Sequence, residues 1–353
     1  MLYRYPINDA HIHVFDPDDI DEVIQMVDWC GYTHWSHLAY TGMRQPFGLV
    51  QNLLGALLKL KEGGRCRAFA SFHYDNDIRV PDADELLRQI EWFDKAGFDG
   101  IKMMDGKPGI RLRQGIPLDA PNYDKMFDYA QRTQFPILYH INDPIEFWYE
   151  EKLPQWAVKQ GLFYDKRFPH KFELDEETFG ILRKHPNLNL CIAHFFFVSD
   201  QPGLCCEMFD RYPNLFFDIT PGWEMFENFA KDRDYWRSFF KKYSHKILFG
   251  TDTFSDHWKE TVTCLQRVME TDEAFVAFEE NCIGLDLDEQ TLRDIYFNNY
   301  HKFVRNLEKR IDVDMVLAYA DTLYARVPRD ENYDKACRLI DRMKREIAAY
   351  RNA

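Results

Sequence analysis

The 353-residue sequence predicts a (β/α)8 barrel, because short apolar runs alternate with longer segments whose apolar residues recur at helical spacing. Eight such runs occur before residue 253: "IHV" after His11, "THWSHLAY" at 33–40, "RAFASF" at 67–72, "FDGIKMM" at 98–104, "FPILYHI" at 135–141, "LNLCIAHF" at 188–195, "LFFDIT" at 215–220 and "KILFGTD" at 246–252. Strands that alternate with helices form parallel sheets, and eight such units close into a barrel.

The segments between the runs carry helix signals. In the segment 81–97 the apolar residues follow a Pro and Asp start at helical spacing, and they are Leu86, Leu87, Ile90 and Phe93. Gly97 then suits the end of a helix. In both "KHPNLNLCIAH" and "RYPNLFFDIT", a proline ends one helix and an asparagine turn precedes the next strand.

An open doubly wound sheet is the structural alternative to the barrel. Such a sheet normally binds a nucleotide at a glycine-rich first turn. The first turn of this sequence reads "HIHVFDPDD", which contains no glycine. The length of the chain allows either two ordinary domains or one large barrel.

Composition excludes several classes of partner. The formal net charge is −14 and no long block of Lys or Arg occurs, so we expect no nucleic acid and no membrane surface as partner. The first residues, "MLYRYPI", lack the features of a signal peptide, and no apolar run approaches about 18 residues. The eight cysteines include no Cys-x-x-Cys pair, so they predict neither a thiolate metal site nor a redox motif. We therefore expect a cytoplasmic protein that acts on a small molecule.

Two histidines flank Ile12 near the start of the chain. Residues two apart on a strand share a face, so His11 and His13 point into the barrel mouth if Ile12 points outward. Two neutral imidazoles there can chelate one metal ion. A His-x-His pair is also common as a solvated pair on an edge or loop, so the pair needs support from elsewhere in the chain.

That support comes from the ends of three later runs. His140 closes the fifth run, His194 closes the sixth and Asp252 closes the eighth. Each follows apolar residues, where an unpartnered polar side chain would be costly to bury. One such residue alone would more often be a satisfied core residue. Together they offer imidazole and carboxylate ligands that suit Zn²⁺ or a neighbouring divalent metal.

At these positions the sequence resembles the metal-dependent amidohydrolase superfamily, in its amidohydrolase family 2 branch. The resemblance rests on "DAHIHV", "GFDGIKMM", "ILYHI", "CIAHF" and "LFGTD" at the first, fourth, fifth, sixth and eighth strands, and it extends to "IYFNNYHKFV". It implies a metal-dependent hydrolase barrel over residues 1–310, followed by a C-terminal helical extension at 311–353.

The resemblance also implies roles for individual residues. It assigns the metal to His11, His13, His140 and Asp252. From the chemistry of metal-bound water we also expect Asp252 to take a proton in catalysis. His194 would be an acid/base or hydrogen-bonding group beside one metal ion. Zinc is the first expectation, with Mn, Ni or Fe as alternatives.

Lys102 leaves the number of metal ions open. In binuclear relatives a carboxylated lysine on the fourth strand bridges two ions, and the histidines of the fifth and sixth strands bind the second. We place a single ion ahead of this arrangement. Lys102 could then meet an anionic substrate group, or pair with an acid and take no part in the chemistry.

The loops are expected to select the substrate. The connection at 142–172 is long and aromatic, so it is either a lid over the site or a hairpin that packs on the barrel. The residues predicted to contact the substrate are Lys102, His73, Arg111, Arg113 and Trp148. The basic residues among them would favour a carboxylate-bearing substrate. The final segments carry two amphipathic helical patterns, which would brace the barrel or form a homodimer contact.

Three functions remain open from the sequence. The first is hydrolysis of an amide, ester or lactone by metal-activated water. The second is non-oxidative, metal-dependent decarboxylation of a small aromatic or unsaturated carboxylic acid. The third is a catalytically silent barrel that acts as a binding protein, against which the complete ligand set speaks.

Overall fold

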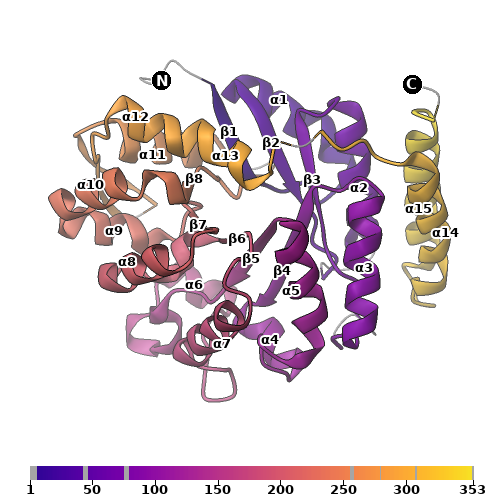
Figure 1. The fold of residues 1–353 in the computed structure, drawn as a ribbon, viewed down its shortest axis with the longest axis horizontal. Coiled ribbons are helices and arrows are strands. Elements are labelled where there is room, and N and C mark those ends of the chain that lie inside the picture. Colours follow the sequence, from indigo (N-terminus) through magenta and orange to yellow (C-terminus); the bar gives the residue numbers. More distant parts are fainter. Residues whose placement is uncertain are drawn as a thin grey trace.

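The computed structural model describes residues 6–42, 47–74, 79–254, 258–278, 280–306 and 308–351, and it confirms the barrel. Eight parallel strands follow one another around the sheet in sequence order (Figure 1). Their bounds are β1 Ile7–Ile12, β2 Tyr32–Leu38, β3 Cys66–Ala70, β4 Gly100–Gly106, β5 Ile137–Ile141, β6 Leu190–Ile192, β7 Leu215–Asp218 and β8 Ile247–Leu248.

The barrel closes between its first and last strands. The Ala10 amide donates to the Phe249 carbonyl at 2.9 Å, and the Asp252 amide donates to the His11 carbonyl at 2.8 Å. A parallel bridge between Ile12 and Thr253 continues the seam. The chain just after β8 therefore lies directly beside the end of β1.

Helices surround the strands. Their bounds are α1 Ile20–Cys30, α2 Phe47–Lys61, α3 Ala83–Lys95, α4 Pro108–Gln114, α5 Pro121–Thr133, α6 Gln155–Gln160, α7 Lys171–Lys184, α8 Pro202–Arg211, α9 Trp223–Lys231, α10 Arg233–Lys242, α11 Trp258–Glu270, α12 Glu289–Arg293, α13 Asn299–Phe303, α14 Val313–Leu323 and α15 Tyr333–Ala348. A short antiparallel hairpin, β9 Ala274–Ala277 and β10 Glu280–Ile283, follows α11. No helix among the described residues combines the length and apolarity that a membrane crossing requires.

The first strand begins earlier than the sequence suggested. It covers "INDAHI", so His11 lies within the strand and His13 directly follows it. The apolar pattern did not indicate this start because Asn8 and Asp9 are polar yet fully buried. Asn8 accepts hydrogen bonds from Thr33 and His34 of the next strand, and these bonds satisfy its side-chain oxygen.

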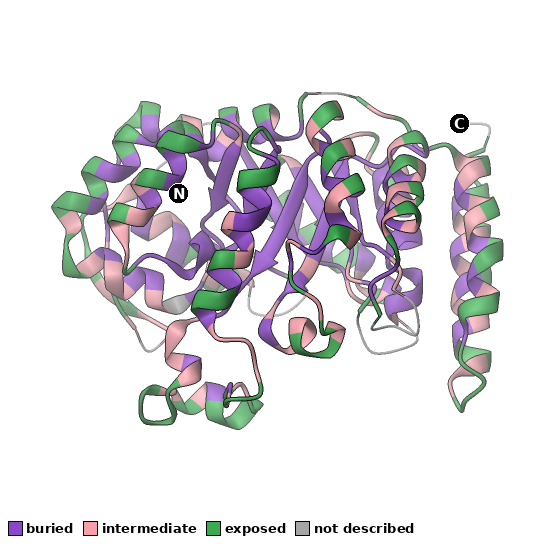
Figure 2. Cartoon of the chain, turned by 60° about the horizontal axis from the view of Figure 1, so that its bottom comes forward, coloured by how far each residue is buried: buried purple, intermediate pink, exposed green. Residues whose placement is uncertain are grey.

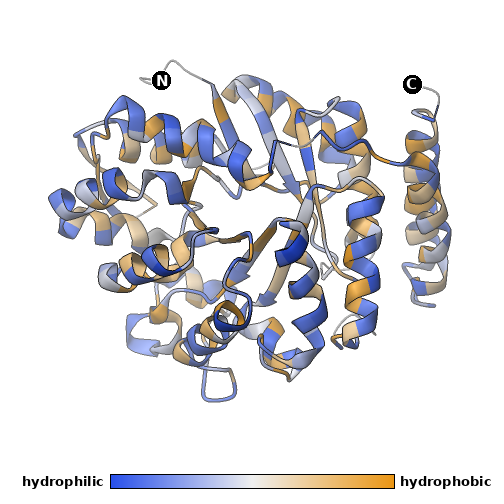
Figure 3. Ribbon diagram, in the orientation of Figure 1, coloured by the Kyte–Doolittle hydropathy of each residue, from blue (hydrophilic) through white to orange (hydrophobic). Residues whose placement is uncertain are grey.

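The inside of the barrel is apolar toward the N-terminal ends of the strands and polar at its mouth, where the strands have their C-terminal ends. Inward-facing side chains form one cluster with the helix that closes the N-terminal end, and they are Ala10, Leu38, Phe69, Leu138, Cys191, Ala193, Phe216, Leu248, Tyr300, Phe303 and Val304. Figure 2 shows the strands almost wholly buried, and in Figure 3 apolar and hydrophilic colours occur together along the strands and helices. The polar residues at the C-terminal strand ends therefore lie above a packed floor.

The last two helices stand outside the barrel on the side of α2 and α3 (Figure 1). Helix α15 packs on α2, and its buried face consists of Ala336, Ile340, Met343 and Ile347. The two helical patterns predicted at the end of the chain are thus present. They brace the wall of the barrel, on the side of the second strand.

Gly97 connects this extension to the barrel. It has φ = 95°, and a Cβ there would overlap the Arg310 carbonyl oxygen. The neighbouring Ala96 carbonyl accepts a hydrogen bond from Asp312 at 3.0 Å. The end of α3 therefore holds the strand-like segment that leads into α14.

Replacement of Gly97 by alanine should destabilise the protein by combining left-handed strain with a backbone clash. Gly64 is the matched control, because it has φ = 92° and a Cβ added there would meet nothing within 4 Å. Gly97→Ala should lower the free energy of unfolding by about 2 kcal/mol more than Gly64→Ala, measured by urea denaturation. Equal losses would show that the contact with Arg310 is not tight.

Candidate metal centre

Three side chains from the two ends of the barrel seam converge at its mouth. His11 Nε2 and His13 Nε2 lie 3.3 and 3.2 Å from Asp252 Oδ1. One ligand atom of each residue lies within 4.8 Å of the corresponding atoms of the other two. Both histidines are buried. These two imidazoles and one carboxylate form a group able to hold a metal ion.

A hydrogen bond from Nδ1 orients the imidazole ring of each histidine. His11 Nδ1 donates to Asp218 Oδ2 at 2.9 Å, and His13 Nδ1 donates to the Leu38 carbonyl at 2.8 Å. With the proton on Nδ1, the lone pair of each ring is on Nε2, which faces Asp252. Hydrogen bonds of this kind fix the tautomer and direction of metal-binding histidines. The Asp252 carboxyl stays ionised: although burial opposes it, His11 and His13 hold its pKa well below the usual range.

Asp218 is a site residue that the sequence interpretation missed. Besides His11, it accepts hydrogen bonds from the His194 amide at 2.8 Å and from the Thr220 hydroxyl at 2.5 Å. It is fully buried at the end of β7. A similar signal was available for it, because it follows three apolar residues within the run "LFFDIT" and ends the strand that they form.

His140 and His194 form a second group beside the first. His194 Nε2 lies 3.1 Å from His140 Nδ1 and 3.8 Å from Asp252 Oδ2. Burial lowers the pKa of His140 to about 4 and that of His194 to about 3, so both rings are neutral at pH 7. His140 lies next to His194 rather than within the closest group of three, and its role as a ligand stays a prediction.

Lys102 lies at the floor of the site. Its Nζ is 3.0 Å from His11 Nε2, and the side chain is almost completely buried. Burial lowers the pKa of this amine to about 8. The amine therefore borders the metal ligands, and its roles as a bridging carbamate or as a contact for an anionic substrate group stay predictions.

The backbone at the site is strained. His194, Phe195, Phe196 and Phe197 have φ of 56°, 52°, 55° and 51°, so they form a left-handed turn without glycine. Asp252 also has a positive φ, of 54°. Left-handed conformation costs about 1–2 kcal/mol for each such residue. The surrounding packing holds this strain, which includes two of the predicted site residues, His194 and Asp252.

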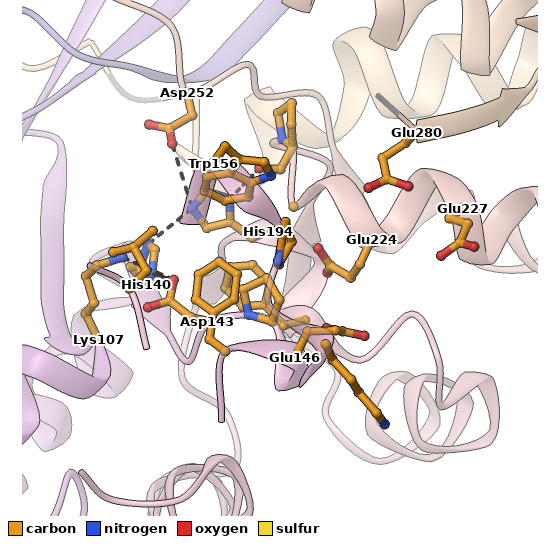
Figure 4. Close-up of a pocket in the computed structure, with 18 residues that line it drawn as sticks. Lys107, His140, Asp143, Glu146, Trp156, His194, Glu224, Glu227, Asp252 and Glu280 are labelled. Carbon is orange, nitrogen blue, oxygen red and sulfur yellow. Dashed lines mark hydrogen bonds and ion pairs between the residues drawn. The ribbon is translucent and has the colours of Figure 1, made fainter. Parts of the chain in front are cut away.

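A cavity of about 360 Å³ opens beside these groups (Figure 4). Its lining residues are Lys107, His140, Asp143, Pro144, Glu146, Phe147, Lys152, Pro154, Trp156, Leu162, His194, Phe197, Pro221, Gly222, Glu224, Glu227, Asp252 and Glu280. This volume suits a small ligand. The connection at 142–172 supplies one wall of the cavity, and it also has its own small apolar core around Phe147, Ala157 and Tyr164.

Two of the predicted substrate contacts lie elsewhere because other side chains bind them. Arg111 forms a two-point ion pair with Glu177, with N···O distances of 3.0 and 2.8 Å. His73 contacts the Tyr319 hydroxyl in a separate hollow between α3 and α14. Neither is among the described residues that line the cavity at the metal group.

Two more predicted contacts are also directed away from this cavity, and the fifth, Lys102, is not among its described lining residues either. The Trp148 indole donates to the Pro169 carbonyl at 3.2 Å, and its ring lines a hollow on the far side of the connection. Arg113 borders a small space beside Tyr40 and Asp105. Of the described cavity wall, Phe147 and Trp156 supply the aromatic surface that the connection was expected to offer.

The sequence matches a known protein family, and the fold is similar to solved structures. A family model described as amidohydrolase matches residues 65–305. No curated protein matches the sequence. Among solved structures, 2,6-dihydroxybenzoate decarboxylase from Rhizobium is 12% identical, with a TM-score of 0.55 over 86% of this chain and 99% of its own.

Two further structures are similar to the same degree. A dihydroxybenzoic acid decarboxylase from Polaromonas sp. JS666, with bound manganese and the inhibitor 2-nitroresorcinol, is 13% identical, with a TM-score of 0.52 over 86% of this chain and 97% of its own. A 4-oxalomesaconate hydratase from Rhodopseudomonas palustris is 12% identical, with a TM-score of 0.50 over 90% of this chain and 99% of its own. At these identities the likeness shows the fold alone.

Replacement of Asp218 by asparagine should weaken metal binding about 10- to 100-fold. An amide nitrogen facing His11 Nδ1–H would force the imidazole proton onto Nε2, the atom that must ligate. Asp9→Asn is the control: Asp9 accepts from the His11 backbone amide, not from the ring, and burial already raises its pKa to about 7. Metal affinity measured by competition with a chelator should fall only for Asp218→Asn. Unchanged affinity would mean that Asp218 does not orient a ligand.

Proposed function

The chain belongs to the amidohydrolase family, and from this premise we propose that it is a divalent-metal-dependent hydrolase that cleaves an amide, ester or lactone bond of a small substrate. One observation carries the proposal: His11, His13 and Asp252 converge at the mouth of the barrel, with their ligand atoms turned toward one another. The cavity beside them gives a substrate access to this point.

The residues present fit a divalent metal ion. Both histidines offer Nε2, because hydrogen bonds from Nδ1 to Asp218 and Leu38 fix their tautomers. His11, His13 and Asp252 would hold the ion, with His140 as the predicted fourth ligand. When bound, such an ion lowers the pKa of a coordinated water toward about 7 and polarises a substrate carbonyl. Zinc remains the first expectation, and manganese, nickel or iron also suit these ligands.

Asp252 and His194 would carry the proton transfers. The Asp252 carboxylate is ionised and borders the cavity, so it can accept a proton from water and pass it to the leaving group. His194 is neutral and lies within 3.8 Å of Asp252 Oδ2, so it can orient the water or donate a hydrogen bond to the developing oxyanion. The left-handed turn fixes its ring at that position.

The charge of the cavity supports hydrolysis over decarboxylation. Its wall carries six acidic side chains against two lysines: Asp143, Glu146, Glu224, Glu227, Asp252 and Glu280 against Lys107 and Lys152. Burial raises the pKa of Glu224 to about 8, and the other five acids still outnumber the lysines. An anionic substrate would meet net repulsion there. A neutral or cationic substrate suits this wall better than the carboxylate-bearing one expected from Arg111, Arg113 and His73.

Decarboxylation is the second candidate. Two of the structures that share this fold are decarboxylases of dihydroxybenzoates, one with bound manganese. Lys102 adds a buried cation near the metal ligands, where a substrate carboxylate could be held. Both reactions would use the same ligands.

Turnover should be tested with aryl and small carboxylic acids, lactones, esters and amides, measuring both carbon dioxide release and proton release. We expect hydrolysis with metal supplied, and loss of both metal and turnover in the double variant His11→Ala/His13→Ala. Carbon dioxide release would favour the second candidate. A metal-loaded protein with neither activity would favour a binding protein, and wild-type metal content in the double variant would refute the assigned site.

His194→Asn should retain the metal but lower turnover about 100-fold or more, because a positioned acid/base group or oxyanion donor is lost while the closest ligands remain. Elemental analysis and steady-state rates on the same sample separate the two effects. Loss of one of two ions per chain would instead make the site binuclear, with Lys102 as the bridging carbamate. Full retention of both metal and rate would make His194 a packing residue.

A further inference from the structure

Glu224 stands out among the acids of the cavity because, in the described part of the chain, no other residue pairs with its carboxyl group. Both of its carboxylate oxygens are shielded from solvent, and neither accepts a hydrogen bond from any other described residue. Its neighbours in the wall are paired: Asp143 with Lys107 at 3.1 Å, and Glu227 with Lys231 at 3.3 Å. A buried carboxylate without a donor is costly, so such a group calls for a partner that enters from outside.

A second carboxylate makes this cost larger. Glu146, from the 3-10 turn Ile145–Trp148 that follows β5, also has a buried oxygen, Oε2, without a described partner. Burial, with a smaller contribution from the negative charge of Glu146, raises the pKa of Glu224 to about 8. The two acids line the same cavity from different walls, one on α9 and one on the connection at 142–172. A positive group between these two carboxylates would offset the repulsion between their charges.

The position of Glu224 relates it directly to the metal end of the cavity. A Cβ on Gly222 would lie 2.9 Å from both Glu224 Oε2 and Phe197 Cε1, so these two side chains cover the same glycine. The Phe197 ring in turn stacks on His194, with centroids 5.0 Å apart and planes 17° from parallel. Figure 4 shows Glu224 between His194 and Glu227 in this view. About one aromatic ring thus separates the unpaired carboxylate from the predicted acid/base group.

The surroundings suit an organic cation better than a second metal ion. Aromatic faces stabilise organic ammonium groups, and the wall includes Phe147, Trp156 and Phe197. In the part of the chain that the structure describes, the one metal-capable group of three ligands consists of His11, His13 and Asp252. Glu146 and Glu224 belong to no such group.

We propose that Glu224, assisted by Glu146, is a specificity-determining residue that binds a cationic nitrogen group of the substrate about one ring's width from the bond that reacts. This assignment rests on the proposed function, because it names the class of substrate for the same site. The substrate would be a small molecule with a scissile bond at the metal end and an ammonium or amidinium group at the other. Its nitrogen would donate hydrogen bonds to the Glu224 carboxylate.

Binding of benzylamine and of benzyl alcohol to the metal-loaded protein tests the proposal, because the two probes share a ring and differ in charge. Calorimetry at pH 8 should show that the wild type binds benzylamine about 10-fold or more tightly than benzyl alcohol, the scale of a hydrogen bond to a buried charged group. Glu224→Gln should remove this preference. Glu227→Gln is the matched control, since Glu227 lies on the same helix and lines the same cavity but is paired, and it should keep the preference.

Three results would overturn the assignment: no saturable binding of benzylamine by the wild type, equal affinity for the two probes, or an unchanged preference in Glu224→Gln. Metal content measured on the same samples separates this inference from the proposed function. Protein that holds no metal yet still prefers benzylamine would refute the hydrolase and leave the cation site standing. Protein that holds metal without the preference would refute the cation site alone.

Discussion

The site depends on one constraint, which is closure of the barrel between β1 and the chain after β8. The hydrogen bond from the Asp252 amide to the His11 carbonyl joins residues 241 positions apart in sequence, and both residues are candidate metal ligands. The His13 amide donates to the Thr253 carbonyl at 2.9 Å and extends the same seam. The two histidines and the carboxylate therefore meet only when the last strand returns to the first.

The buried polar groups around the seam are almost all satisfied by partners from other strands. Asp218 joins β7 to His11 and His194, and the Asp9 carboxyl accepts from both the amide and the hydroxyl of Thr251. Such networks are stable only when each member has a partner, because an unpaired polar group in a dry interior is costly. Several other described buried polar atoms also lack a partner, but Glu224 differs from them because both oxygens of its carboxyl group do so, and because it lines the cavity beside the metal group.

Periodicity in the sequence was enough to predict the fold, because parallel strands buried on both faces appear as continuous apolar runs. It also singled out His11, His13, His140, His194 and Asp252. Each alone would more often be a satisfied core residue, but several runs that carry such a residue near their ends together indicated a common site, and the structure brings His11, His13 and Asp252 together. Periodicity could not predict the direction of a side chain that is set by tertiary contacts. Arg111 follows the fourth strand as expected, but Glu177, 66 residues later, binds its guanidinium.

Other site features gave weaker signals or none. Asp218 lies at the end of a strand, but it is none of the predicted metal ligands, so the sequence did not predict a role for it. Glu224 lies in a helix with an ordinary acidic first turn, and its burial becomes visible only when the connection at 142–172 is placed opposite it. The candidate metal ligands and the cavity walls come from different parts of the chain, and this separation has an evolutionary consequence. The candidate ligands lie at strand ends that the seam holds in place, whereas Glu146, Phe147, Trp156 and Glu224 come from segments outside the barrel sheet. Those segments can change length and composition without disturbing the seam, so descendants of this chain could acquire new substrates while inheriting the same reactive centre.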